Sequence, residues 1–106
     1  MAFKTHEITQ YNYSFSSSGG GVATMQLWHD HTEVVRINFI DEDAVLPPPA
    51  IGGDLETAVA VYRRSALPAL VDMLRHEKPV KATINDQPPG FVFVHIGPEP
   101  VGEGEV

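Results

Sequence analysis

The sequence predicts an α+β domain in which a mostly antiparallel sheet of about five to six strands carries one principal helix on one face, at about residues 66–77. Two observations support this prediction. Apolar and polar residues alternate at every second position in several segments, which is typical of half-buried strands. Helical spacing of apolar residues occurs in a single segment, residues 65–78. The element order that results is β-β-β-β-α-β-β.

Three strands with short connections are predicted at the start of the chain, and they favour an antiparallel meander. In the first, Tyr11, Tyr13 and Phe15 fall on one side of the pleat, and Ile8 falls on the other. A run of serines and glycines follows this strand and is typical of a turn. The three predicted strands are residues 7–15, 22–29 and 33–41.

Residues 41–54 are predicted to be a long surface loop, because they combine an acidic triplet, three prolines and two glycines. Consecutive prolines favour an extended polyproline II conformation. The following segment, residues 56–64, could begin a helix or form a strand. We favour a strand, because its β-branched and aromatic residues suit a pleated sheet and Ser65 marks a new helix start.

The predicted helix has a start, an apolar stripe and a stop. Ser65 is expected to cap it by accepting a hydrogen bond from a backbone N–H of the first turn, which puts Pro68 at the third helical position. The residue before Pro79 is disfavoured in the α conformation, so the helix should end near Glu77 or Lys78. The stripe consists of Leu67, Leu70, Val71 and Leu74.

Two further strands are predicted after the helix. Residues 80–85 alternate, whereas residues 91–97 are apolar on both faces. The second pattern predicts a central strand, or one whose second face is covered by the helix or by a partner subunit. Residues 1–97 are therefore expected to form a single domain. Residues 98–106, rich in proline, glycine and glutamate, are expected to form a flexible acidic tail.

Composition restricts the function classes. The chain of 106 residues contains no cysteine, which excludes disulfides and thiolate chemistry and favours a cytoplasmic protein. No apolar run reaches the roughly 20 residues that a membrane span needs, and the first residues lack a signal-peptide pattern. A formal net charge of −7 opposes binding to nucleic acid and to anionic membranes.

Histidines offer the candidate metal ligands. His29 and His31 flank Asp30, and on an extended strand their imidazoles would point to one side, as in sites for zinc or a similar divalent cation. The same residues lie where two predicted strands meet, so they could instead form the tip of a hairpin. His95 could be a general base or a hydrogen-bonded core residue. No catalytic residue or resident cofactor is predicted, because the nucleophile-elbow and phosphate-loop patterns are absent from the sequence.

Aromatic and cationic residues could form a binding surface. On an exposed sheet face they could stack on bases or anchor a protein partner, whereas under the helix the aromatic residues would belong to the core. One short helix cannot cover a sheet of five or six strands, so a second copy of the chain is expected to cover the remainder as a homodimer. The candidate surface comprises Tyr11, Tyr13, Trp28, Arg63, Arg64 and Lys81.

The run VDMLRHEKPV and the ending EPVGEGE resemble a pattern in a family of small bacterial proteins, in which a Leu-Arg-x-Glu-Lys-Pro run closes a helix and leads into a strand. This resemblance covers part of the chain and implies a small soluble bacterial protein. It implies no reaction, cofactor or substrate, and it transfers no functional residue. The order of elements is also similar to that of sheet-platform binders of single-stranded nucleic acid, which is an analogy of fold alone.

The sequence therefore favours a non-enzymatic interaction module that works as a homo-oligomer and meets its partner through an exposed sheet or through the loop at residues 41–54. Two alternatives stay open. One is a sheet-platform binder of single-stranded nucleic acid. The other is a small metal-dependent or acid–base enzyme that uses His29 and His31.

Overall fold

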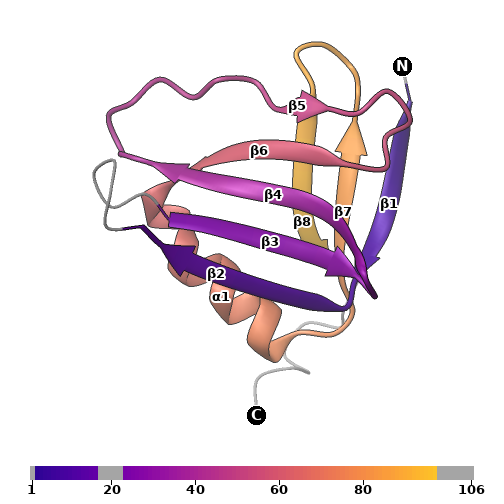
Figure 1. Cartoon of the computed structure of the whole chain (residues 1–106), viewed down its shortest axis with the longest axis horizontal. Helices are drawn as coiled ribbons and strands as arrows, with labels where there is room; N and C mark the ends of the chain where they lie inside the picture. The colour runs from indigo at the N-terminus through magenta and orange to yellow at the C-terminus, as the bar shows by residue number, and fades with distance from the viewer. Residues whose placement is uncertain (1, 17–22, 98–106) are drawn as a thin grey trace.

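The computed structural model describes residues 2–16 and 23–97 and confirms the α+β class with mostly antiparallel strands. Within these residues, eight strands form a five-stranded sheet of order β2-β3-β4-β6-β5 and a three-stranded sheet of order β1-β7-β8 (Figure 1). The strands are β1 (Phe3–Ile8), β2 (Gln10–Phe15), β3 (Ala23–His29), β4 (Thr32–Ile40), β5 (Ala50–Ile51), β6 (Ala58–Arg63), β7 (Val80–Asn85) and β8 (Phe91–Ile96). A 3-10 turn, η1 (Arg64–Ala66), leads into the helix α1 (Leu67–His76).

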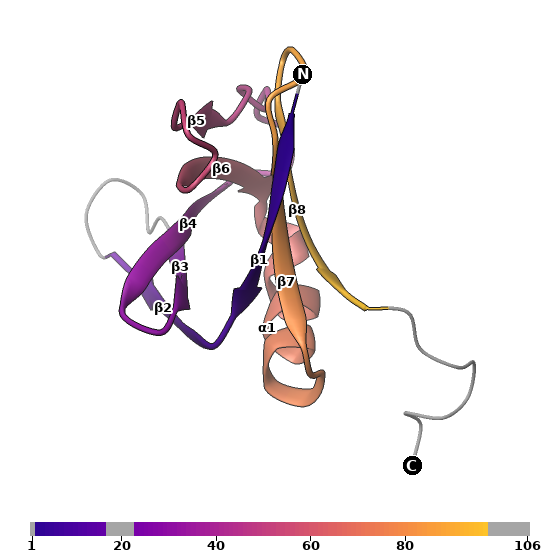
Figure 2. The ribbon, with the colours of Figure 1, turned by 90° about the vertical axis from the view of Figure 1, so that its right-hand side faces the viewer.

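The two sheets and the helix form two layers. The five-stranded sheet makes one layer, and the three-stranded sheet lies beside α1 in the other (Figure 2). The strands of the two sheets run across one another (Figure 1). One face of the five-stranded sheet is therefore covered jointly by a second sheet and by the helix.

The apolar core lies between these layers. Met25, Leu27, Ile37 and Phe39 project from the centre of the five-stranded sheet and are fully buried, as is Ile84 from the opposite layer. Burial alternates along both β3 and β7, so each sheet has one inner face. Removing these side chains from water is the main favourable contribution to folding.

The prediction of one strand over residues 7–15 is wrong, because this segment is divided between two strands of different sheets. The alternation changes phase at Thr9: Ile8 is buried in β1, and the next side chain packed on the core is Tyr11 in β2. The Thr9 hydroxyl accepts a hydrogen bond from the Asp30 backbone N–H at 2.6 Å, which fixes the point where the chain changes sheets.

The single predicted sheet is likewise corrected to two sheets in the described residues. The antiparallel meander β2-β3-β4 is confirmed, and so is the strand predicted at residues 56–64, which is β6. The pair β4–β6 is parallel, because the long loop carries the chain back along the sheet before β6 begins. Of the two alternatives for residues 91–97, the central strand is wrong, because β8 lies at an edge of the three-stranded sheet.

The helix is close to its predicted range. It spans Leu67–His76, and its apolar stripe packs on the core, with Leu70 buried. The chain leaves the helical conformation at Glu77, whose backbone N–H donates to the carbonyl of Met73 at 2.9 Å. The stop placed before Pro79 is therefore confirmed to within one or two residues.

The start of the helix differs from the prediction. The N-cap position is Ala66 rather than Ser65, and no side chain caps it. The Ser65 backbone N–H instead donates to the Glu42 carboxylate at 2.7 Å, within the turn η1. Pro68 therefore occupies the second helical position, where its missing N–H has no intrahelical partner to lose.

Phe39→Ala should lower the free energy of unfolding by about 3–5 kcal/mol, because Phe39 is fully buried and its loss leaves a cavity. Urea unfolding followed by circular dichroism measures this change. Phe3→Ala is the matched control: Phe3 is 66% exposed, so its truncation should cost no more than about 1 kcal/mol. Equal losses in the two variants would contradict this assignment of the core.

Candidate functional site

The His-x-His motif lies at the tip of the β3–β4 hairpin. Asp30 and His31 form the turn, and Asp30 has a left-handed φ of 54°. His29 Nδ1 lies 2.9 Å from the carbonyl oxygen of Glu7. Within the part of the chain that the structure describes, no group of three or more His, Cys, Asp or Glu side chains could hold a metal ion. Binding of a divalent cation by His29 and His31 stays a prediction.

The predicted aromatic surface is divided between the two faces of the five-stranded sheet. Opposed residues of paired strands point to the same face. Tyr11 and Tyr13 lie opposite buried residues of β3 and are therefore on the core side. Trp28 follows the buried Leu27 along β3 and points to the outer face. The three aromatic side chains do not form one platform.

The predicted cationic residues also lie apart. The Arg63 guanidinium donates to the carbonyl of Ala44 at 2.8 Å. Arg64 lies 3.5 Å from the Asp41 carboxylate, so both arginines hold the start of the loop that follows β4. Lys81 belongs to β7 in the other sheet. The structure does not bring the six candidate residues together into one surface.

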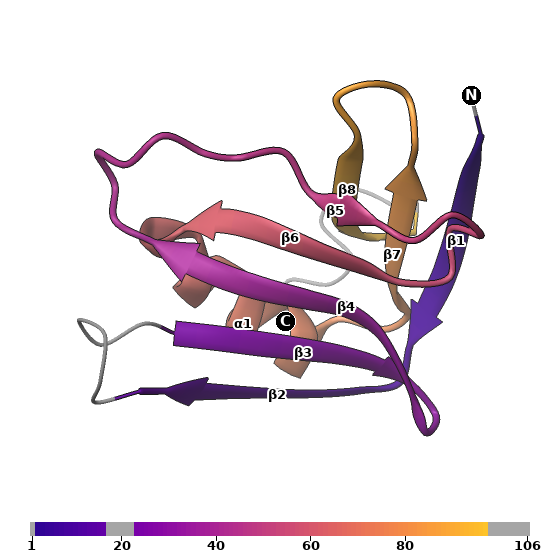
Figure 3. The same cartoon turned by 45° about the horizontal axis from the view of Figure 1, so that its top comes forward.

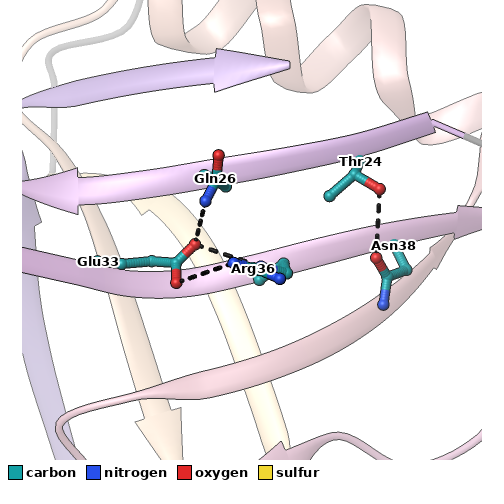
Figure 4. Close-up of polar contacts among 5 residues, drawn as sticks. All are labelled: Thr24, Gln26, Glu33, Arg36 and Asn38. Carbon is teal, nitrogen blue, oxygen red and sulfur yellow. Dashed lines mark hydrogen bonds and ion pairs between the residues drawn. The ribbon is translucent and has the colours of Figure 1, made fainter. Parts of the chain in front are cut away.

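The outer face of the five-stranded sheet carries a ladder of polar side chains (Figure 4). Gln26 donates to the Glu33 carboxylate at 2.6 Å, and the Arg36 guanidinium donates to the same group at 3.3 and 3.4 Å. Thr24 donates to the amide oxygen of Asn38 at 3.4 Å. These polar groups hydrogen bond to one another, and the same face also carries the apolar side chains of Trp28 and of Val59, which is 39% exposed.

The outer face of the three-stranded sheet is aromatic. Phe3, Phe91 and Phe93 are 66%, 43% and 51% exposed. The rings of Phe91 and Phe93 stack with their centroids 5.9 Å apart and their planes 13° apart. Sequence reasoning missed these residues as a surface, although the apolar character of both faces of residues 91–97 was the available signal.

A hydrogen-bonded row crosses the same sheet. The Thr83 hydroxyl lies 2.8 Å from the Thr5 hydroxyl and 2.8 Å from His95 Nε2. His95 is thus half-buried and hydrogen bonded on the outer face, not in the core. A hydroxyl beside an imidazole is one requirement of nucleophilic catalysis. This pair lies on an open sheet face, which does not exclude water from a reaction.

The sheet edges differ in how they are protected. An edge strand presents backbone N–H and C=O groups that can pair with another chain, and short length or charged side chains discourage this pairing. In the described chain the edge strands are β1, β8, β2 and β5. β5 has only two residues, and β1 carries Lys4 and Glu7.

The edge strand β8 is protected by a side chain from the other layer. The Tyr62 hydroxyl donates to the carbonyl of Val92 at 2.9 Å. Burial raises the pKa of the Tyr62 phenol above its ordinary value, and a hydrogen bond with the Val94 backbone partly opposes this rise. Tyr62 therefore occupies backbone groups of β8 that another strand could otherwise use.

Within residues 2–16 and 23–97, none of these protections is found at β2. Its sequence, QYNYSF, contains no charged residue and no proline. Tyr13 is 44% exposed and Phe15 is 65% exposed, and their rings meet edge to face with centroids 6.1 Å apart. β2 borders the five-stranded sheet, and no other described strand lies beyond it (Figure 3). We call this border, Gln10–Phe15, the β2 edge.

Two open clefts lie beside the start of the β2 edge. One, of about 530 Å³, is lined in part by Tyr11, His76 and Pro79 and lies toward the end of α1. The other, of about 540 Å³, is lined in part by Asn12 and Trp28. Side chains of an added strand would alternate between the two faces of the sheet, so both clefts could receive them.

Comparison with known proteins gives no family for this chain: no family model, no curated protein and no solved structure matches it. Among the described residues, no helix has the length and apolar character needed to cross a membrane.

Tyr62→Phe should lower the free energy of unfolding by about 1 kcal/mol, because it removes the hydrogen bond to Val92. The raised pKa means that the folded protein keeps the phenol proton at a pH where the unfolded chain loses it. The contribution of the protonated Tyr62 phenol to the free energy of unfolding is therefore present below about pH 10 and is lost as the pH rises through the folded-state pKa of Tyr62.

Ultraviolet titration of the folded protein measures the ionisation of its three tyrosines. One phenol should ionise later than an ordinary tyrosine, and the Tyr62→Phe variant should lack this late step. Tyr13→Phe is the control and should retain it. A late step that persists in Tyr62→Phe would show that the buried phenol has been assigned to the wrong residue.

Proposed function

We propose that this chain is a non-enzymatic interaction module that works as a homo-oligomer, in which the β2 edges of two copies pair antiparallel and join their five-stranded sheets. The observation that supports this most directly is the chemistry of β2: it is an edge strand without charge or proline, and no side chain among the described residues caps it as Tyr62 caps β8. Such edges are usually protected in proteins that stay monomeric.

The side chains of the β2 edge are compatible with their own copies. Opposed residues in an antiparallel pair point to the same face. If Tyr13 lies opposite Tyr13 of a second copy, Tyr11 lies opposite Phe15 of that copy, so the aromatic residues of both chains meet on one face. Asn12 and Ser14 of both copies then meet on the other face. This register would bury the exposed parts of the Tyr13 and Phe15 rings.

The distribution of charge also favours the β2 edge as the contact between two copies. Each copy has a formal net charge of −7, so two copies repel one another at long range. The β2 edge itself carries no charge. Salt screens the repulsion without weakening the backbone hydrogen bonds or the apolar contacts, so dimerisation should become tighter as ionic strength rises. An interface held by ion pairs would show the opposite dependence.

The alternative functions have less support from the geometry. The aromatic and cationic residues considered for nucleic-acid binding lie on separate faces and in separate sheets. The imidazole of His29 is directed to the carbonyl of Glu7 at a hairpin tip. Neither of these sets of side chains is gathered into one site, whereas the residues of the β2 edge are already adjacent along one strand.

Tyr13→Lys should convert the dimer to monomer, with a dissociation constant raised about tenfold or more, because it places a lysine of each copy at the centre of the paired edge. Size-exclusion chromatography with light scattering at micromolar concentration measures the mass. Phe93→Lys is the matched control. Phe93 is also a half-exposed aromatic residue on an edge strand, but it lies in the other sheet, so this variant should stay dimeric.

Circular dichroism checks that both variants are folded. Ser14→Lys, at an exposed position of the same edge, is a second variant that should also be monomeric by light scattering. A monomeric mass for the unaltered protein would overturn the proposal. Loss of the dimer in Phe93→Lys but not in Tyr13→Lys would place the contact on the aromatic face of the three-stranded sheet instead.

A further inference from the structure

The loop between β4 and β5 contains an unusual exposed segment. Residues 44–50 read AVLPPPA; Val45 is 90% exposed and Leu46 is 42% exposed. Pro47 and Pro48 are exposed as well. We call residues 45–49 the proline strap, which runs past the β6 side of the five-stranded sheet (Figures 1 and 3). Consecutive exposed apolar residues are disfavoured in a soluble fold unless they have a function.

The first end of the proline strap is held by hydrogen bonds. The Arg63 guanidinium donates to the carbonyl oxygens of Glu42 and Ala44. The Ser65 backbone N–H donates to the Glu42 carboxylate, and this bond lowers the pKa of that carboxyl group. The Ala44 N–H closes a turn on the carbonyl of Asp41 at 3.2 Å. These contacts fix the direction in which the chain enters the strap.

The second end is held by packing. The strap leads directly into β5, which pairs with β6. Pro49 and Ile51 lie close to Gly90, which has a φ of +100°. A Cβ atom at Gly90 would come within 2.8 Å of Ile51 Cδ1 and 3.5 Å of Pro49 Cγ, so the glycine allows this close approach. The strap is therefore fixed at both ends while its middle is exposed.

The strap has the chemistry of a polyproline II ligand. Each proline fixes φ near −65°, and a residue that precedes a proline is restricted to extended conformations. Pro47, Pro48 and Pro49 have no backbone N–H, so the backbone of these three residues offers a partner hydrogen-bond acceptors and no donor. A segment that is held in its bound conformation loses little conformational entropy on binding.

We propose that the proline strap is the ligand of a partner protein with an aromatic-lined groove. Such grooves accept proline rings between aromatic side chains, and Leu46 supplies an adjacent apolar anchor. Asp43 is exposed beside the strap, and the chain has a net charge of −7. A groove with basic residues at the rim nearest Asp43 therefore fits this surface best.

The strap and the β2 edge are separate surfaces. In the five-stranded sheet β2 forms one border, and β6 and β5 lie at the other. The strap runs along this second border (Figure 3). Binding of a groove to the strap and pairing of two β2 edges can therefore occur in the same assembly, and each can fail without the other.

A purified WW domain and a purified SH3 domain are suitable probes, since both bind polyproline II ligands in aromatic-lined grooves. Each isotope-labelled domain is titrated with the full unlabelled chain and followed by nuclear magnetic resonance. We expect groove resonances of at least one domain to shift, with a dissociation constant below about 1 mM. The double variant Pro47→Ala with Pro48→Ala should bind about tenfold more weakly, because it loses two rings and the fixed backbone.

Pro68→Ala is the matched control, because Pro68 is also exposed but lies at the start of α1. It should bind like the unaltered chain, and so should Tyr13→Lys, which tests the β2 edge separately. Circular dichroism checks the fold of the double variant, and Leu46→Ser, which keeps all three prolines, should also weaken binding. The proposal is overturned if neither domain shows groove shifts, or if the folded double variant binds as tightly as the unaltered chain.

Discussion

The stability of this fold depends on removing one apolar surface from water, namely the inner face of β3 and β4. Met25, Leu27 and Ile37 on this face are fully buried, although α1 has only 10 residues and covers part of the sheet. The chain covers the remainder by turning at Thr9, so that β1 leaves the five-stranded sheet and pairs with β7 in the opposite layer. A second small sheet thus does what a longer helix or a second helix does in other α+β folds.

This division of the strands also determines which edges need protection. Two sheets have four edges, and the turn at Thr9 leaves β2 with no described strand on its outer side. β5 is very short, β1 is charged, and β8 is capped by the Tyr62 hydroxyl. The position of the uncharged strand β2 at an edge therefore follows from the same change of direction that completes the core.

Local features were predictable from the sequence. The helix stripe around Leu70 and the strand over residues 58–63 depend on spacing and propensity, which a short segment carries by itself. The helix start was less predictable, because Glu42, distant in sequence, competes for the backbone of Ser65. The division into two sheets depends on packing between distant strands. Its one local sign was the change of phase at Thr9.

The two candidate surfaces were predictable only in part, because they too combine local sequence features with contacts between distant segments. The lack of charge in QYNYSF can be read from the sequence, but its position at an edge cannot, because strand order is set by non-local pairing. The proline strap was expected as an extended loop, whereas its anchoring by Arg63 depends on the parallel pairing of β4 with β6. If both proposals hold, a dimer joined at its β2 edges presents two proline straps at the outer borders of one continuous sheet. A partner with two suitably spaced grooves would then gain affinity through effective concentration, without any contact beyond those of a single strap.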